Sequence, residues 1–63
     1  MNRFKIIEFF KTQRITKSEF CKKCKITIFT LDNIVYYDAS VDFAVAERIA
    51  AVMGLGVYQL YTF

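Results

Sequence analysis

The sequence predicts an all-α fold, a single domain of four or five short helices over residues 1–63. It contains no proline, and its two glycines, Gly54 and Gly56, lie close together, so few positions interrupt a helix. Apolar residues make up 56% of the chain, which is more than a disordered segment carries. Several of them recur at helical spacing just after residues that cap helices. These patterns favour a compact arrangement of helices joined by tight turns.

Cap signals place the first two helices. Asn2 is a good N-cap for the first helix. The apolar stripe of this first helix consists of Ile6, Phe9 and Phe10. Thr16 and Glu19 have the spacing of a capping box, in which the threonine hydroxyl accepts from the Glu19 amide and the Glu19 carboxylate accepts from the Thr16 amide. The second helix is therefore expected to run from Lys17 to about Cys24.

Two further helices are expected after a short turn. Thr27 can cap a third helix over residues 28 to about 36. Ser40 can cap a fourth, which places Asp42 in its positive first turn, where a carboxylate is stabilising. The apolar stripe of this helix consists of Val41, Val45, Ile49 and Val52. Gly54 follows the stripe and is expected to end the helix.

Positive charge is concentrated in the first part of the chain. Residues 1–25 contain eight Lys or Arg against two Glu, a net charge of +6. Residues 26–63 contain one Arg against four acidic residues, a net charge of −3. One end of the molecule should carry a positive field that suits a polyanion such as nucleic acid. The other interpretation is a solubilising face without a specific partner.

Several function classes are not favoured. No run of about 20 apolar residues exists that could span a membrane. Charges at Arg3 and Lys5 interrupt the apolar stretch that a signal peptide needs. We therefore expect a cytoplasmic protein without a membrane partner. The chain has no histidine and no glycine-rich phosphate loop, so we expect that it is not an enzyme.

Cys21 and Cys24 form a CxxC motif whose flanking lysines would favour the thiolate. A zinc site needs two more Cys or His ligands, and the chain offers none, although a metal shared across a dimer is an alternative. A thioredoxin-like role would need a βαβ context. We expect two core thiols, with no metal and no cofactor.

The turn between the second and third predicted helices suits a sharp helix-turn-helix corner, because residues 25–27 are too few for an ordinary antiparallel hairpin. From Ile15 to Val35 the spacing resembles the helix-turn-helix of phage repressors and Cro proteins, with the motif over about residues 17–36. The residues that carry this resemblance are Lys17, Phe20, Cys21, Ile26, Leu31 and Ile34. The predicted first and fourth helices also fall where that five-helix fold has them.

The resemblance implies a transcriptional regulator that binds double-stranded DNA as a homodimer, with a recognition helix of about residues 28–36 in the major groove. The residues implied at base edges are Thr27, Ile28, Phe29, Thr30 and Asn33, with Lys17 near the DNA backbone or an outer base. Those implied at phosphates are Arg14, Lys22 and Lys23. Asn33 can bond adenine bidentately, and Ile28 or Phe29 can pack on a thymine methyl group.

The chain departs from the family pattern in three ways. Lys25 stands where members usually have glycine, because that position takes a left-handed φ, and we expect a cost of about 1 kcal/mol. Phe10 and Val35 stand where many members have an Arg–Glu ion pair; loss of both charges together is physically coherent. Asp32 and Asp38 would be repelled by phosphate.

An alternative function uses the same fold. Adjacent hydrophobic residues on the third helix suit a protein interface better than a phosphate-lined groove, so the chain could be an interaction module, such as a phage-type inhibitor or antirepressor. Its binding surface would consist of Ile28, Phe29 and Tyr36. The surface of the third helix discriminates between the two functions: polar and basic for DNA, apolar for protein.

The last seven residues, 57–63, alternate like a strand, yet they could equally form one helical turn. They are too apolar for a free chain end, which favours a homodimer interface, as the resemblance also implies. The interface would consist of Val57, Tyr58, Leu60, Tyr61 and Phe63. The alternative is that the tail folds back and completes the core of the monomer.

Overall fold

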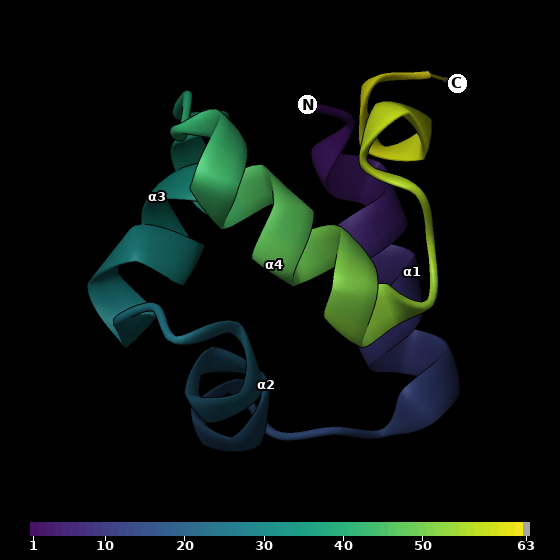
Figure 1. Cartoon of the computed structure of the whole chain (residues 1–63). Coiled ribbons are helices and arrows are strands. Elements are labelled where there is room, and N and C mark those ends of the chain that lie inside the picture. The colour runs from purple at the N-terminus through teal and green to yellow at the C-terminus, as the bar shows by residue number, and fades with distance from the viewer. Residues whose placement is uncertain (63) are drawn as a thin grey trace.

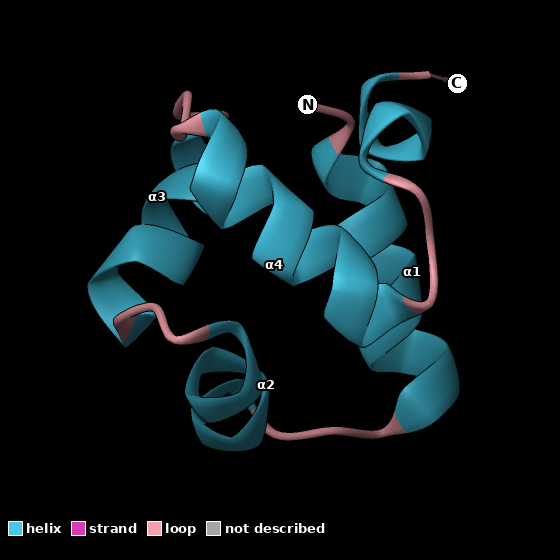
Figure 2. Cartoon of the chain, in the orientation of Figure 1, coloured by secondary structure: helices cyan, strands magenta, loops and turns pink. Residues whose placement is uncertain are grey.

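The computed structural model describes residues 1–62, and over these residues the chain forms helices and no strand (Figure 1, Figure 2). The elements, in order, are α1 (Arg3–Gln13), α2 (Lys17–Cys24), α3 (Ile28–Tyr37), α4 (Phe43–Met53) and the 3-10 helix η1 (Val57–Tyr61). The prediction of an all-α fold is therefore confirmed. None of the described helices has the length and apolar character needed to cross a membrane.

Three of the four α-helices begin at the cap that the sequence predicts. The side chain of Asn2 accepts a hydrogen bond from the Phe4 amide at 3.1 Å. The Thr16 hydroxyl accepts from the Glu19 amide at 3.1 Å, and Thr27 caps α3 in the same way. The Glu19 carboxylate accepts from the Thr16 hydroxyl at 3.4 Å, rather than from the Thr16 amide as expected.

Helix α4 begins later than the sequence predicts. Its N-cap is Asp42, not Ser40, and the Asp42 carbonyl accepts the first helical hydrogen bond from the Ala46 amide at 3.0 Å. Asp42 therefore precedes the first turn, and its side chain makes no capping bond. The preceding helix ends on Asp38 with a left-handed φ of 53°. The chain uses residues 39–42 to turn toward α4.

All four α-helices end on a residue in the left-handed region, as expected for Lys25. The residues and their φ values are Arg14 (51°), Lys25 (59°), Asp38 (53°) and Gly54 (72°). At the ends of α2 and α4 the next amide also reaches back to a carbonyl five residues earlier, which is the Schellman pattern. At the end of α3 the next amide reaches back six residues, to the Asn33 carbonyl. The donors of these bonds are the apolar residues Ile26, Ala39 and Leu55.

The core fills the space that the helices enclose. Phe20 of α2 is completely buried and lies against the rings of Phe9 and Phe10, with ring centroids 5.8 Å and 4.9 Å away. The other buried side chains are Ile6, Cys21, Cys24, Leu31, Ile34, Ala46, Ile49, Ala50 and Leu60. Arg48 of α4 donates from Nε to the Cys24 carbonyl at 2.8 Å, which ties α4 to the end of α2.

The tail forms the short helix η1, so the helical alternative holds over residues 57–61. Gln59 closes its first turn: the Gln59 amide donates to the Gly56 carbonyl at 3.0 Å, and its side-chain oxygen accepts from the Gly56 amide at 2.7 Å. Leu60 is completely buried, whereas Tyr58 and Tyr61 are exposed.

The two ends of the chain lie side by side (Figure 1). The Asn2 backbone amide donates to the Leu60 carbonyl, and its side-chain amide donates to the Thr62 carbonyl at 3.0 Å. Lys5 donates to the Gln59 carbonyl and, at 3.1 Å, to the Thr62 hydroxyl. We call this set of hydrogen bonds the terminal clasp.

Candidate nucleic-acid interface

The turn between α2 and α3 consists of Lys25, Ile26 and Thr27. The Lys25 amide donates to the carbonyls of Cys21 and Lys22, and the Ile26 amide donates to the Cys21 carbonyl at 3.0 Å. Ile26 is partly buried against the core, which anchors the turn from below. Thr27 then caps α3 directly. This arrangement places the N-terminal end of α3 beside the lysine-rich end of α2.

The first turns of α3 expose the side chains that the sequence predicts at base edges. Phe29 is 75% exposed and Ile28 is 47% exposed. The hydroxyls of Thr27 and Thr30 lie 3.0 Å apart and hydrogen-bond to each other. Asn33 is partly exposed, and it lies four residues after Phe29, so the two side chains share a face of the helix.

Lys17 is held against α3 by two side chains. Its ammonium group donates to Asp32 at 2.9 Å and to the Tyr36 hydroxyl at 3.3 Å, and it lies 5.1 Å from the centroid of the Tyr36 ring. The hydrogen bond to Asp32 raises the pKa of Lys17 above its usual value. Lys17 therefore lies beside the third helix with its charge already paired.

Sequence reasoning missed this cluster of Lys17, Asp32 and Tyr36. Asp32 was expected only as a source of repulsion toward phosphate, and it instead neutralises a neighbouring lysine. The spacing of Asp32 and Tyr36, four residues apart, was the available signal, because it places both on one face of α3.

The residues expected at phosphates are all exposed but do not form one group. Lys22 and Lys23 lie in the last turn of α2, and Arg14 ends α1. Arg14 and Lys23 lie along a groove that no residue of α3 lines. This groove is lined by Phe9, Gln13, Arg14, Ile15, Glu19, Lys23, Val52, Met53 and Gly54. Arg14 and Lys23 thus share one groove, whereas Lys22 is not among the residues that line it.

Phe10 and Val35, which the resemblance aligns with an ion pair, line one groove between α1 and α3. The remaining lining residues are Ile7, Lys11, Lys17 and Leu31. The groove is therefore mainly apolar, with two lysines among its lining residues.

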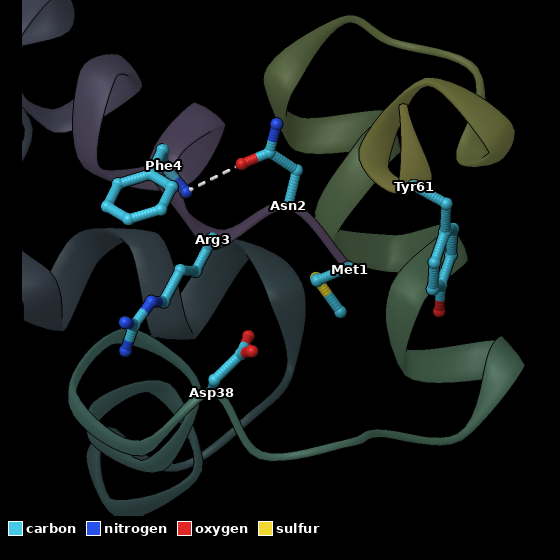
Figure 3. A pocket seen from close by; sticks show the side chains of 6 residues that line it. All are labelled: Met1, Asn2, Arg3, Phe4, Asp38 and Tyr61. Atoms are coloured by element: carbon cyan, nitrogen blue, oxygen red, sulfur yellow. Dashed lines mark hydrogen bonds between the residues drawn. The ribbon is translucent and has the colours of Figure 1, made fainter. Parts of the chain in front are cut away.

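A second cleft lies at the other end of α3 (Figure 3). It is lined by Met1, Asn2, Arg3, Phe4, Asp38 and Tyr61. Arg3 donates from Nη1 to the Val35 carbonyl at 3.1 Å, and its guanidinium lies 5.3 Å from the centroid of the Phe4 ring. Asp38 therefore lies among the first residues of α1, far along α3 from Phe29.

Cys21 and Cys24 are free, buried thiols. Burial raises the pKa of the Cys24 thiol to about 11, and it also raises the pKa of Cys21. The expectation that the flanking lysines would favour the thiolate is therefore wrong, because burial of the two thiols disfavours their charged form. Within residues 1–62, no three metal-ligating side chains come together.

The tail residues expected at a dimer interface divide between core and surface. Leu60 is buried in its own chain and is therefore not available to a second copy, and Val57 is partly buried. Tyr58 is 75% exposed, and its ring centroid lies 6.3 Å from that of Phe43, which is also exposed. Phe63 lies outside the described residues.

Comparisons with models of protein families, with curated proteins and with solved structures found no match for this chain.

Proposed function

We propose that the chain is a transcriptional regulator of the helix-turn-helix type that binds double-stranded DNA through the N-terminal half of α3. In such proteins the first residues of the recognition helix contact base edges in the major groove. The observation that carries the proposal is the corner between α2 and α3. It presents Phe29 and Asn33, both accessible, beside the exposed lysines at the end of α2.

Phosphate contacts would come from the basic end of α2. Lys22, Lys23 and Lys25 are exposed and lie within four residues of one another, next to the start of α3. Contacts to phosphate fix the position of a protein on the duplex, whereas contacts to base edges give sequence preference. On this proposal, both kinds of group would come from adjacent elements, α2 and α3.

The salt dependence of duplex binding tests this proposal. The logarithm of the affinity for random-sequence duplex DNA should fall with the logarithm of salt concentration, by about 0.9 per phosphate neutralised. The Lys22→Gln and Lys23→Gln double variant should bind all sequences more weakly, with a slope reduced by about 1.8. Lys11→Gln, an exposed lysine on α1, is the control for loss of charge alone. No measurable binding of folded protein to any duplex at low salt would refute the proposal.

A second candidate function is a protein-interaction module, and one observation favours it. Helix α3 exposes four large apolar side chains and carries no Lys or Arg. The four are Ile28, Phe29, Tyr36 and Tyr37. An exposed apolar patch of this kind is typical of a protein interface. On this alternative, folded protein would leave duplex DNA unbound and would bind a partner in a way that depends on Ile28 and Phe29.

A further inference from the structure

We infer that the exposed start of α3 recognises A·T-rich DNA and distinguishes thymine by its methyl group; this inference rests on the proposed function. It depends first on what α3 lacks. The helix has no Lys or Arg, which are the side chains that most commonly bond guanine in the major groove. Lys17 of the adjoining helix, which contacts α3, is already paired with Asp32 at 2.9 Å.

The side chains that α3 does present match thymine. Phe29 and Ile28 offer apolar surface at the first turn, with 75% and 47% of each residue exposed. The only apolar feature that base pairs present in the major groove is the methyl group of thymine. Thr27 and Thr30 direct their hydroxyls toward each other, so the polar groups closest to Phe29 are engaged within the helix.

Asn33 supplies the partner contact to adenine. It lies four residues after Phe29 on the same face of α3, about 6 Å further along the axis. Successive bases on one strand are about 3.4 Å apart, so the two side chains can reach base pairs one or two steps apart. An asparagine amide bonds adenine through its N6 and N7 atoms. Phe29 and Asn33 together therefore specify a thymine and an adenine one or two steps apart.

The experiment has two stages. Wild-type protein is first used to select bound duplexes from a random-sequence pool at moderate salt, and we expect an A·T-rich consensus. In the selected duplex, thymine is then replaced by uracil, which removes only the methyl group. We expect about fourfold weaker binding for each contacted methyl that is lost, because each buries about one methylene equivalent of apolar surface.

Two variants assign the effect to α3. Phe29→Ala should abolish most of the difference between thymine and uracil duplexes. Tyr37→Ala is the matched control, because Tyr37 is equally exposed, at 78%, but lies at the opposite end of the same helix. This control should retain the wild-type difference. Circular dichroism establishes that both variants are folded.

Failure of the inference and failure of the proposed function give different results. If no duplex binds at low salt, the proposed function fails and the inference fails with it. If duplexes bind but the consensus is rich in G·C, or if uracil and thymine duplexes bind equally well, the proposed function stands and the inference is overturned. A thymine preference that Phe29→Ala leaves intact would also overturn it, because the methyl contact would then lie elsewhere.

Discussion

Lys17 has two competing partners, the Asp32 carboxylate that it contacts at 2.9 Å and, on the proposed function, a phosphate of bound DNA. An exposed ion pair contributes little to stability. The main effect of this pair is therefore to occupy the Lys17 charge, which would otherwise be free to bind an anion. While the pair is intact, Lys17 contributes little to the attraction of DNA. On the proposed function, Asp32 would therefore limit sequence-independent binding to DNA.

Removal of the Asp32 charge should strengthen non-specific binding. We expect Asp32→Asn to raise the affinity for random duplex DNA and to steepen the salt dependence by about 0.9, since Lys17 becomes free to neutralise one phosphate. Asp38→Asn is the control, because it makes the same change of charge at the far end of α3. Equal effects of the two substitutions would show that net charge alone is responsible.

Cys24 links stability to alkaline pH. Burial raises its pKa in the folded protein to about 11, above the ordinary value of 9.0 that the unfolded chain has. The unfolded state therefore releases its proton first, and the stabilising contribution is complete below pH 9 and is lost as the pH rises toward 11. We expect the free energy of unfolding to fall less steeply between these values in Cys24→Ala than in the wild type. Denaturant titrations at several pH values measure this; identical slopes would contradict it.

At the scale of the helix, the four α-helices end in the same left-handed backbone conformation, but the residues that adopt it differ in side chain. Gly54 adopts the left-handed region without a Cβ penalty, whereas Arg14, Lys25 and Asp38 do so with a side chain. Each non-glycine residue there costs about 1 kcal/mol. Three of the four helix ends are therefore strained relative to a glycine.

Lys25→Gly should stabilise the protein. The φ of 59° suits glycine, and removal of the Cβ should increase the free energy of unfolding by about 1 kcal/mol, or about 4–8 °C in melting temperature for a domain of this size. Gly54→Ala is the reciprocal variant. No atom lies within 4 Å of an added Cβ there, so its loss of stability should reflect backbone strain alone. Thermal melts of both variants check this, and a lower melting temperature for Lys25→Gly would contradict it.

The sequence predicted the start of a helix correctly wherever the side chain of the N-cap residue bonds an amide in the first turn. Asn2, Thr16 and Thr27 each accept from an amide in the first turn, which is a property of the local sequence. The predicted start of α4 was wrong because serine and aspartate are equally good N-cap residues, so residue type does not decide between Ser40 and Asp42. The choice depends on how far the chain must travel after α3, and that is a tertiary property.

The tail and the candidate site also combine features that local sequence predicts with features that depend on tertiary contacts. Residues 57–61 alternate like a strand, and their helical form is accompanied by contacts with Asn2 and Lys5 at the other end of the sequence. The start of α3 was predictable from Thr27 alone. The pairing of Lys17 with Asp32 was not, because it depends on the angle at which α2 crosses α3.

At the scale of the whole molecule, the exposed aromatic residues Phe43 of α4 and Tyr58 of η1 form a pair, with ring centroids 6.3 Å apart. We propose that this pair lies at the two-fold contact of a homodimer, in which two copies of α3 would meet successive turns of the major groove. Tyr61, 47% exposed, would lie toward its edge.

Two substitutions in the tail separate the interface from the core. Tyr58→Glu should convert a dimer into a folded monomer, because this exposed side chain contributes little within its own chain. Leu60→Ala should instead destabilise the fold by about 2–5 kcal/mol, since it leaves a cavity at a completely buried position. Sedimentation and thermal melts distinguish the two outcomes. Wild-type protein that sediments as a monomer at tens of micromolar would refute the dimer.

The terminal clasp has a consequence for the order of folding. Its hydrogen bonds join residues separated by 54 to 60 positions, nearly the full length of the chain, whereas the helices and their caps form from neighbours. Closure of a long loop costs more chain entropy than closure of a short one. The four helices can therefore associate in the rate-limiting step before the two ends meet. The clasp would then form after the folding transition state. Its loss would therefore accelerate unfolding while leaving the folding rate nearly unchanged.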